Sequence, residues 1–438
     1  MNYNLFLLLT ATTVGGVAGA TAIYAGQSPN RSGSAATMIA GLAASIVATI
    51  VVATREGSEL FSMLHLYYLI GTIAVPMAGL GLLINWKHQR FLGRFVGAAA
   101  IFVAPLGIYA SHIEPFWLRL DDIALPAPRS MAGLRIGVLA DLQSTEIGEY
   151  EQNAITELIN QGPDIVLVPG DFWQMSPEQF ERRAPSFAAE LARLDAAVPH
   201  VFMVKGNTDT VDGLRRLAAG TGVVVLDNEV ANIVVNGQAV RVGGITLNGD
   251  EARAAGAIRQ LTDRATGAFV PPLESVEPPA NPLANEDTSV ENSAGDNTAD
   301  DNAIVGQVDP AAPDAEVAPA APAAVTPNQD DAVFRILLAH KPDEISRLPG
   351  DDSVNLVVAG HTHGGQIRMP GFPPPLILSS VPRTVGGGGL HRLDDHWIYV
   401  STGVGRERGR APQVRLGVRP SIGILTTVDV TTVVLPDN

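Results

Sequence analysis

The chain has 438 residues and a formal charge of −16 at pH 7, and this length suffices for two or three domains. Residues 271–331 contain 13 Asp or Glu and neither Lys nor Arg, so the rest of the chain is close to neutral and offers no basic patch of the kind that binds nucleic acid. The absence of cysteine excludes disulfides and thiolate metal sites.

Four apolar stretches occupy the first 115 residues. Each is close to the roughly 20 residues that a helix needs to cross a bilayer. They are Leu5–Ala25, Ala35–Thr54, Leu60–Ile84 and Phe95–His112, and none contains Asp, Glu, Lys or Arg. The leading "MNYN" lacks the positive charge of a signal peptide. We therefore predict a membrane domain of four transmembrane helices over residues 1–115.

The basic residues between these stretches predict their orientation. The segment 85–94 contains Lys87, Arg90 and Arg94 and is the most basic one in the region, and Arg31 lies in the first connection. Cytoplasmic loops are enriched in Lys and Arg. We therefore expect a multi-pass protein of the cytoplasmic (inner) membrane, whose chain beyond residue 115 lies on the extracytoplasmic side.

A second domain is predicted over residues 130–438, where short β-rich runs each end on a polar residue. The runs are "LRIGVLAD" (134–141), "DIVLVPGD" (164–171), "HVFMVKGN" (200–207), "RILLAH" (335–340) and "NLVVAGH" (355–361). Helical patterns at 149–161 and 177–197 separate the first three. This alternation predicts a mainly parallel sheet whose polar strand ends lie along one edge.

Further β-rich runs predict a second sheet packed beside the first. They lie at 223–226, 232–236, 239–247, 376–380, 397–402 and 421–428. The Pro-, Ala- and acid-rich segment 271–331 interrupts the pattern, and its composition predicts a disordered insertion. It is either a tolerated surface loop, which we favour, or a protein-binding segment.

The polar strand ends form an ordered set that suits a metal site. In chain order they are Asp141, Asp171, Asn207, His340, His361 and His363, and a glycine stands immediately before three of them. Carboxylate, amide oxygen and imidazole ligands suit Mn, Fe, Zn or similar divalent ions. Taken singly, each strand end is a common turn or an ordinary histidine. The set as a whole indicates a metal site.

These motifs resemble the calcineurin-like metallophosphoesterases, whose pattern reads D-x-H, G-D, G-N-H-[DE], H and G-H-x-H. "AHKPD" (339–343), "GHTHGGQIR" (360–368) and "YVSTGVG" (399–405) resemble the membrane-anchored branch of that family, which includes UDP-2,3-diacylglucosamine hydrolases. The resemblance implies a two-sheet αββα sandwich, here preceded by four transmembrane α-helices.

The resemblance also implies two adjacent divalent metal ions (Mn, Fe or Zn) and assigns their ligands. Asp171 would bridge the ions, site one would take Asp141, Gln143 and His363, and site two would take Asn207, His340 and His361. Such a pair generates a hydroxide nucleophile from water and neutralises phosphate oxygens.

Two residues depart from the family pattern. Gln143 replaces the histidine of D-x-H, and it is either a weaker ligand or a hydrogen-bonding neighbour of the site. Thr208 replaces the histidine of G-N-H-D, which stabilises the transition state or protonates the leaving group, and threonine is a poor acid near neutral pH. Asp209 keeps the acidic residue of that motif, so we place Asp171, Asn207, Thr208 and Asp209 in the catalytic region.

These features predict a membrane-anchored, metal-dependent phosphoesterase that acts on a phosphodiester or pyrophosphate bond. The expected substrate is a phosphorylated small molecule or a lipid-linked one at the membrane lipid surface, and no nucleic-acid partner is expected. The alternative is a degenerate domain that acts as a metal-dependent binding or sensor module. Four arginines after the metal motifs either grip phosphate or are simply solvated, which we favour: Arg383, Arg406, Arg408 and Arg410.

Overall fold

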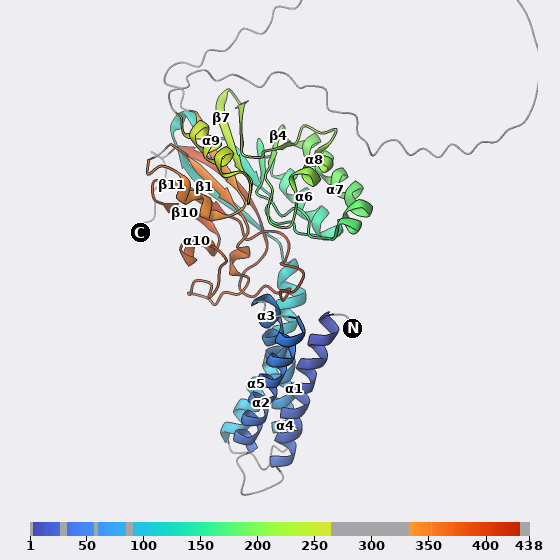
Figure 1. The fold of residues 1–438 in the computed structure, drawn as a ribbon. Coiled ribbons are helices and arrows are strands. Elements are labelled where there is room, and N and C mark those ends of the chain that lie inside the picture. Colours follow the sequence, from blue (N-terminus) through green and yellow to red (C-terminus); the bar gives the residue numbers. More distant parts are fainter. Residues whose placement is uncertain are drawn as a thin grey trace, which may run out of the picture.

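The computed structural model of the protein describes residues 3–26, 33–56, 60–84, 91–263, 333–351 and 353–429. The predicted insertion at 271–331 and most of the basic segment 85–94 lie outside the described residues. An elongated bundle of helices carries a larger domain in which two sheets and their covering helices pack together (Figure 1).

The bundle consists of helices that are long and apolar enough to form four membrane spans. They are α1 (Tyr3–Gly26), α2 (Gly33–Glu56), α3 (Leu60–Leu69) continued by a π-helical turn and α4 (Val75–Ile84), and α5 (Phe91–Ile108). Each of the four predicted apolar stretches is therefore helical. Small residues let the helices approach closely, since a Cβ on Gly81 would lie 2.5 Å from the carbonyl oxygen of Gly19.

The first sheet has the strand order β1-β12-β2-β3-β4-β5. Its strands are β1 (Arg119–Ala127), β2 (Arg135–Val138), β3 (Ile165–Val168), β4 (His200–Met203), β5 (Val224–Val225) and β12 (Ser421–Asp429). Neighbours from β2 to β5 are parallel, and β12 runs antiparallel to β2 but parallel to β1. The carboxyl ends of β2, β3 and β4 therefore lie along the same edge.

The second sheet has the strand order β10-β11-β9-β8-β7-β6. Its strands are β6 (Glu229–Val235), β7 (Gln238–Ile245), β8 (Phe334–Ala339), β9 (Leu356–Ala359), β10 (Gly389–Leu393) and β11 (His396–Val400). The central strands β7, β8, β9 and β11 are parallel, and an antiparallel strand closes each edge. Both sheets thus present several carboxyl strand ends to one region.

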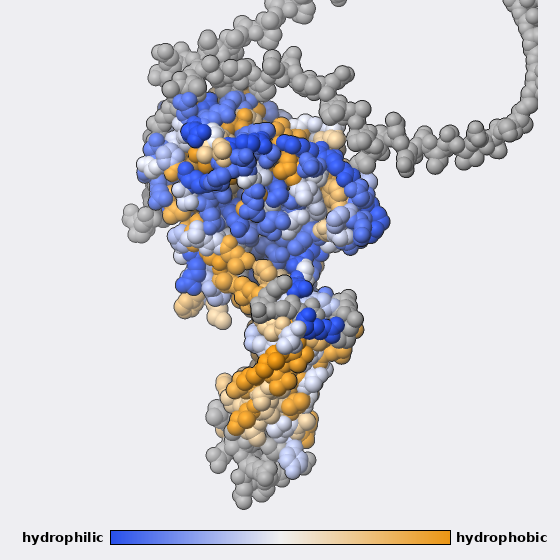
Figure 2. Space-filling model, in the orientation of Figure 1, coloured by the Kyte–Doolittle hydropathy of each residue, from blue (hydrophilic) through white to orange (hydrophobic). Residues whose placement is uncertain are grey.

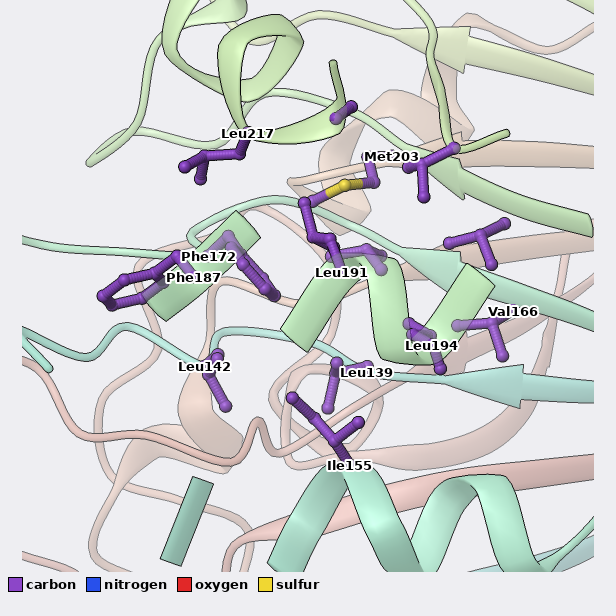
Figure 3. Packing of buried hydrophobic residues seen from close by; sticks show 14 of the residues in the cluster. Leu139, Leu142, Ile155, Val166, Phe172, Phe187, Leu191, Leu194, Met203 and Leu217 are labelled. Atoms are coloured by element: carbon purple, nitrogen blue, oxygen red, sulfur yellow. The ribbon is translucent and has the colours of Figure 1, made fainter. Parts of the chain in front are cut away.

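Helices cover the outer face of each sheet, which confirms the predicted two-sheet α/β fold. The helices α6 (Glu149–Asn160), α7 (Pro177–Ala197) and α8 (Val211–Ala218) cover the first sheet, and α9 (Glu251–Thr262) covers the second. Helix α7 begins where Ser176 accepts a hydrogen bond from the backbone of Gln179. Its buried residues Phe180, Ala184, Phe187, Leu191 and Leu194 recur at helical spacing and pack on the sheet (Figure 3).

Five strand predictions need correction. Residues 376–380 do not form a strand; they follow three consecutive prolines, which cannot donate to a β ladder, and they form an irregular loop. The runs 223–226 and 421–428 correspond to β5 and β12, which belong to the first sheet rather than the second. The runs 335–340 and 355–361 correspond to β8 and β9, which belong to the second sheet rather than the first. Strand β1 was not predicted, because its polar start "RLDD" hides the alternation.

The upper end of the helical bundle contacts the second domain through hydrogen bonds. The backbone N–H of Arg415 donates to the carbonyl of Ala110 at 2.8 Å, and that of Gly417 donates to Glu114 Oε2 at 3.0 Å. Tyr3 Oη donates to the carbonyl of Arg410 at 3.3 Å. The loop that follows β11 is therefore held against the ends of α1 and α5.

Candidate metal centre

The residues that the sequence predicts as metal ligands follow strands of both sheets. Asp141 and Gln143 follow β2, Asp171 follows β3, Asn207 follows β4, His340 follows β8, and His361 and His363 follow β9. The hydrogen bonds and distances given below join residues of the two sheets. The set therefore gathers where the carboxyl ends of the two sheets come together.

Five of these residues have a left-handed backbone, which residues other than glycine adopt infrequently. The φ angles are 44° for Asp141, 43° for Gln143, 52° for Asp171, 69° for His361 and 48° for His363. Each such conformation costs about 1–3 kcal/mol and persists only where the surroundings enforce it. The turns are also tightly packed, because a Cβ on Gly360 would lie 2.6 Å from Asp141 Oδ2. Strain is thus concentrated at the predicted site.

Three ligand atoms of predicted site two converge on one point. His340 Nε2 lies 2.9 Å from Asn207 Oδ1, and His361 Nδ1 lies 3.1 Å from the same oxygen and 3.2 Å from His340 Nε2. Asp171 Oδ2 lies 3.6 Å from His340 Nε2. Around a tetrahedral ion with metal–nitrogen bonds of about 2.1 Å, neighbouring ligand atoms are about 3.4 Å apart. These four side chains have the spacing of a metal site.

The outer nitrogens of the two histidines fix their tautomers. His340 Nδ1 lies 2.8 Å from the carbonyl oxygen of Pro169, and His361 Nε2 lies 3.1 Å from that of Leu378. A carbonyl only accepts, so both outer nitrogens carry the hydrogen and the two inner nitrogens present lone pairs to each other. Two lone pairs at 3.2 Å repel each other unless a cation lies between them. The residues therefore fit a bound metal ion.

The protonation states of the buried groups favour a cation in the same place. Burial lowers the pKa of His361 to about 4, and the neighbouring His340 and Lys341 act in the same direction. Burial also lowers the pKa of His340. Burial raises the pKa of Asp141 well above its usual range, and the charge of Asp171 adds to this effect. Neutral imidazoles beside two closely spaced carboxylates form a site that a divalent ion stabilises.

Predicted site one contains a buried oxygen that lacks a hydrogen-bond partner. Gln143 Nε2 donates to Glu407 Oε2 at 3.3 Å, which leaves Gln143 Oε1 buried and without a partner among the described residues. An amide oxygen in this state is available to a metal ion. Asp141 accepts from the backbone N–H of His361, and Asp141, Asp171 and His340 offer ligand atoms that lie within 4.8 Å of one another.

His363 is buried, but its ring contacts an arginine. Arg415 Nη2 lies 3.2 Å from His363 Nδ1 and also donates to the carbonyls of Thr402 and Gly405. A guanidinium only donates, so Nδ1 accepts and Nε2 of His363 carries the hydrogen in this arrangement. Ligation through Nε2 requires His363 to release Arg415. The structure therefore organises site two more completely than site one.

Thr208 and Asp209 brace the loops that carry Asp171 and Asn207. The N–H of Thr208 donates to Asp171 Oδ1 at 2.9 Å, and its hydroxyl donates to the carbonyl of Trp173 at 2.6 Å. Asp209 accepts from the N–H groups of Phe172 and Gly206 at 2.9 and 2.6 Å. Burial raises the pKa of Asp209 to about 7, and the charge of Asp171 contributes. Both side chains act on the site by holding its backbone.

The sequence analysis missed Glu407 and Arg415. Glu407 accepts from Gln143 and from Gln174, whose Nε2 lies 3.4 Å from Oε1, and burial raises the pKa of Glu407. "GRERG" offered a signal, because an acidic residue between two arginines in a glycine-rich loop near metal motifs is unusual. Arg415 stands in "PQVRLG", which gave no sign that a fully buried arginine would contact His363.

The four singled-out arginines contact backbone atoms or aromatic rings. Arg406 donates to Ser111 and lies over the ring of Phe116, and Arg408 donates to the carbonyl of Gln143 at 2.7 Å. Arg383 donates to the carbonyl of Pro375, and Arg410 lies over the ring of Tyr3. Arg408 is the one that reaches a predicted ligand, through the backbone.

The fold and the gathered polar residues are those expected of a metallophosphoesterase, and comparison with known families agrees. Residues 134–365, more than half of the chain, match the family model described as calcineurin-like phosphoesterase. The protein belongs to the calcineurin-like phosphoesterase family, whose members are hydrolases. The family predicted from the strand-end motifs is confirmed.

Relatives match over shorter segments. The chain is 38% identical over 96 residues to the phosphodiesterase YaeI of Escherichia coli and 36% identical over 96 residues to the uncharacterised metallophosphoesterase YkuE of Bacillus subtilis. Each alignment covers 22% of this chain and 32% of the relative, so the chain spans about a third of their length. A dimetal phosphatase from Danio rerio aligns with 62% of this chain and 88% of its own at 12% identity and a TM-score of 0.30, too low to support an argument.

Proposed function

We propose that this protein is a membrane-anchored hydrolase that cleaves a phosphodiester or pyrophosphate bond with the help of two divalent metal ions. Its membrane domain would span residues 1–115 and its catalytic domain residues 130–438. The proposal rests on the inner ring nitrogens of His340 and His361. Each directs a lone pair at the other, and both nitrogens contact Asn207 Oδ1. This arrangement suits metal binding.

The ligand roles are those that the family resemblance implies, and the contacts among Asn207, His340 and His361 support them. Asn207, His340 and His361 would hold one ion, Asp141, Gln143 and His363 the other, and Asp171 would serve both. When bound, divalent ions act as Lewis acids toward phosphate oxygens and lower the pKa of a bound water to about 7. Mn, Fe and Zn all suit these imidazole and oxygen ligands.

The remaining side chains position the site and limit its acid chemistry. Thr208 fixes one carboxylate oxygen of Asp171 through its N–H, and its hydroxyl proton is committed to the carbonyl of Trp173. The leaving oxygen therefore receives no proton from this position. Hydrolysis breaks one P–O bond and adds the elements of water, so the leaving group takes its proton from solvent or from another donor. Without a second donor the site favours leaving groups of low pKa, such as a nucleotide phosphate.

The finer family branch is part of the same proposal. The motifs "AHKPD" and "GHTHGGQIR" resemble the membrane-anchored branch that includes UDP-2,3-diacylglucosamine hydrolases. The relative YaeI carries the name phosphodiesterase, which supports a phosphodiester as the class of bond. The four apolar helices at the start of the chain agree with a membrane anchor.

We further propose that the catalytic domain lies on the extracytoplasmic side of the cytoplasmic membrane. Helix α4 ends and α5 begins at the end of the bundle away from the catalytic domain, and the sequence between them is the most basic of the region (Figure 1). Val234→Cys in this cysteine-free chain tests the side. A membrane-impermeant maleimide should label it in intact spheroplasts, whereas Gln89→Cys should react only after permeabilisation. The reverse pattern would place the domain in the cytoplasm.

The activity is tested on the full chain in detergent. The metal-free protein, supplied with Mn²⁺, is expected to hydrolyse bis-p-nitrophenyl phosphate, and His361→Ala is expected to abolish turnover. His391→Ala is the matched control, because the His391 ring contacts the carbonyl of Gly388 outside the site and the variant should keep its activity.

The same experiment separates the enzyme from the binding module. Two observations favour a degenerate site. Thr208 stands in place of a catalytic histidine, and His363 contacts Arg415. Tight Mn²⁺ binding without turnover across a panel of phosphodiesters and pyrophosphates would establish the module and refute the hydrolase.

A further inference from the structure

An apolar loop lies beside the metal centre. The loop, residues 366–378, follows the His361–His363 turn and contains "QIRMPGFPPPLIL". From residue 119 to residue 429, the described residues include seven exposed large hydrophobic side chains, and five of them are in this loop: Ile367, Met369, Phe372, Leu376 and Leu378. Met369 and Phe372 are 68% and 69% exposed. Such a concentration marks an interaction surface.

The loop and helix α3 line one cavity that reaches the metal centre. The cavity has a volume of about 340 Å³, within the range of small-molecule sites. It is lined by Phe61, Leu64 and Tyr68 of α3, by Leu376 and Leu378 of the loop, and by His361 and His363. A predominantly apolar space thus joins the predicted metal ligands to a membrane helix.

The position of α3 places the cavity at the membrane surface. Leu60–Ile84 is one of the four candidate spans, and the residues that line the cavity are in its first turns. The first turns of a span lie at the boundary between lipid and water. Figure 2 shows hydrophobic surface on the part of the catalytic domain nearest the helices, while much of the rest of that domain is hydrophilic.

The charges around the loop suit lipid phosphates. Residues 360–393 contain no Asp or Glu, although the chain has a formal charge of −16. Arg383 is exposed and donates to the carbonyl of Pro375 in the loop at 3.4 Å. A loop with exposed Met and Phe, prolines and nearby arginine has the composition of a segment that enters an anionic membrane surface.

The loop is also joined to a metal ligand. The carbonyl of Leu378 accepts from Nε2 of His361 at 3.1 Å and so orients that ring. The side chain of Leu378 lines the cavity. Leu378 therefore contacts both the apolar cavity and the ring of the predicted metal ligand His361.

We propose that the loop 366–378 inserts into the membrane surface and that its cavity with α3 holds the hydrocarbon chain of a membrane lipid whose phosphodiester is the substrate. The proposal rests on the proposed function and names its substrate class. The lipid enters sideways from the bilayer, so its tail occupies the apolar cavity while its phosphate reaches the strand ends. Hydrolysis adds water across one P–O bond, and the tail-bearing product returns to the bilayer.

Insertion is measured without any activity assay. The full chain with Phe372→Cys, its single cysteine, is labelled with an environment-sensitive fluorophore and reconstituted into vesicles of phosphatidylethanolamine and phosphatidylglycerol. Nitroxide-labelled lipid should quench most of this fluorescence. The control is Val234→Cys. Val234 is 51% exposed on the β6–β7 hairpin, which lies far from the membrane helices, so the label there should stay unquenched (Figure 1). Equal lack of quenching at both positions would overturn insertion.

Chain recognition is measured with methyl and dodecyl p-nitrophenyl phosphate in detergent with Mn²⁺. The dodecyl ester should have the higher kcat/KM, and Leu376→Gln should lower the dodecyl-to-methyl ratio by about tenfold. Met369→Gln is the matched control, because Met369 belongs to the loop but does not line the cavity. The dodecyl-to-methyl ratio of kcat/KM should be unchanged in this variant.

The outcomes separate the two proposals. Equal kcat/KM for both esters in the unchanged protein would overturn the lipid substrate and leave the phosphoesterase standing. No turnover of either ester would refute the phosphoesterase and the lipid substrate together.

Discussion

Replacing His361 with alanine is expected to remove half or more of the stability that divalent metal gives this protein. In the metal-free protein His361 Nδ1 and His340 Nε2 present lone pairs to each other at 3.2 Å, so an ion that binds there relieves their repulsion and, through Asn207 of the first sheet, joins the two sheets. The change acts on metal binding itself. It therefore tests the site whether or not the protein turns over substrate.

The magnitude follows from linkage. Metal at about 100 times its Kd stabilises the folded state by about 2.7 kcal/mol, which raises Tm by about 5–10 °C for a domain of this size. Even the loss of a group that only orients a ligand costs about 10–100-fold in metal affinity, so the loss of a ligand costs at least that much. At the same metal concentration the variant should gain only about 0.4–1.4 kcal/mol, or about 1–6 °C.

The assay is thermal unfolding of the full chain in detergent, with chelator and then with Mn²⁺. His391→Ala controls for the loss of an imidazole and should keep the full metal-induced shift. An undiminished shift in His361→Ala would refute the assignment of site two, and the lone-pair argument with it.

Three further predictions concern site one, pH and the core. Gln143→His should raise the Mn²⁺ retained per chain after gel filtration, measured by elemental analysis, since imidazole binds more strongly than the amide oxygen; unchanged or lower retention would show that position 143 holds no ligand. The pKa of Asp209 is raised to about 7 in the metal-free protein, so the folded state binds its proton more tightly and the contribution of Asp209 to the free energy of unfolding should fall by about 4 kcal/mol between pH 4 and 7.5; denaturant titrations should show this fall as the difference between the pH profiles of the unchanged protein and Asp209→Asn, and identical profiles would contradict it. Phe187→Ala should cost about 3–5 kcal/mol, because the ring is fully buried and packs edge-on against Phe172, whereas the exposed Phe372→Ala should cost less than about 0.5 kcal/mol; similar losses in urea unfolding would argue against this core.

Local patterns sufficed to predict much of the catalytic fold. Helix α7 spans the predicted residues 177–197, because Ser176 and Pro177 mark its start and the apolar spacing is helical throughout. The short runs that end in Asp171 and Asn207 are strands because they are buried on both faces and read as continuous apolar stretches. Residues 376–380 are also β-rich in composition, but they form an irregular loop after three consecutive prolines.

The sequence predicted which residues form the candidate site, but it did not predict which contacts they make. Strand-end polar residues in order identified the predicted ligands, and the structure brings His340, His361 and Asn207 together at the carboxyl ends of both sheets. Glu407 and Arg415 lie far along the chain from the residues they contact, Gln143 and His363. No local pattern predicts pairs that are separated by a whole sheet.

The sequence by itself determined the apolar spans, the α/β alternation and the chemistry of the strand ends, because each is set by residues near one another in the chain. Only the tertiary structure decided which sheet each strand joins, which nitrogen of each histidine faces the centre, and that the loop after His363 meets helix α3. These depend on packing between segments that are not neighbours in the chain, where burial and hydrogen-bond geometry select one arrangement among many that the local sequence permits.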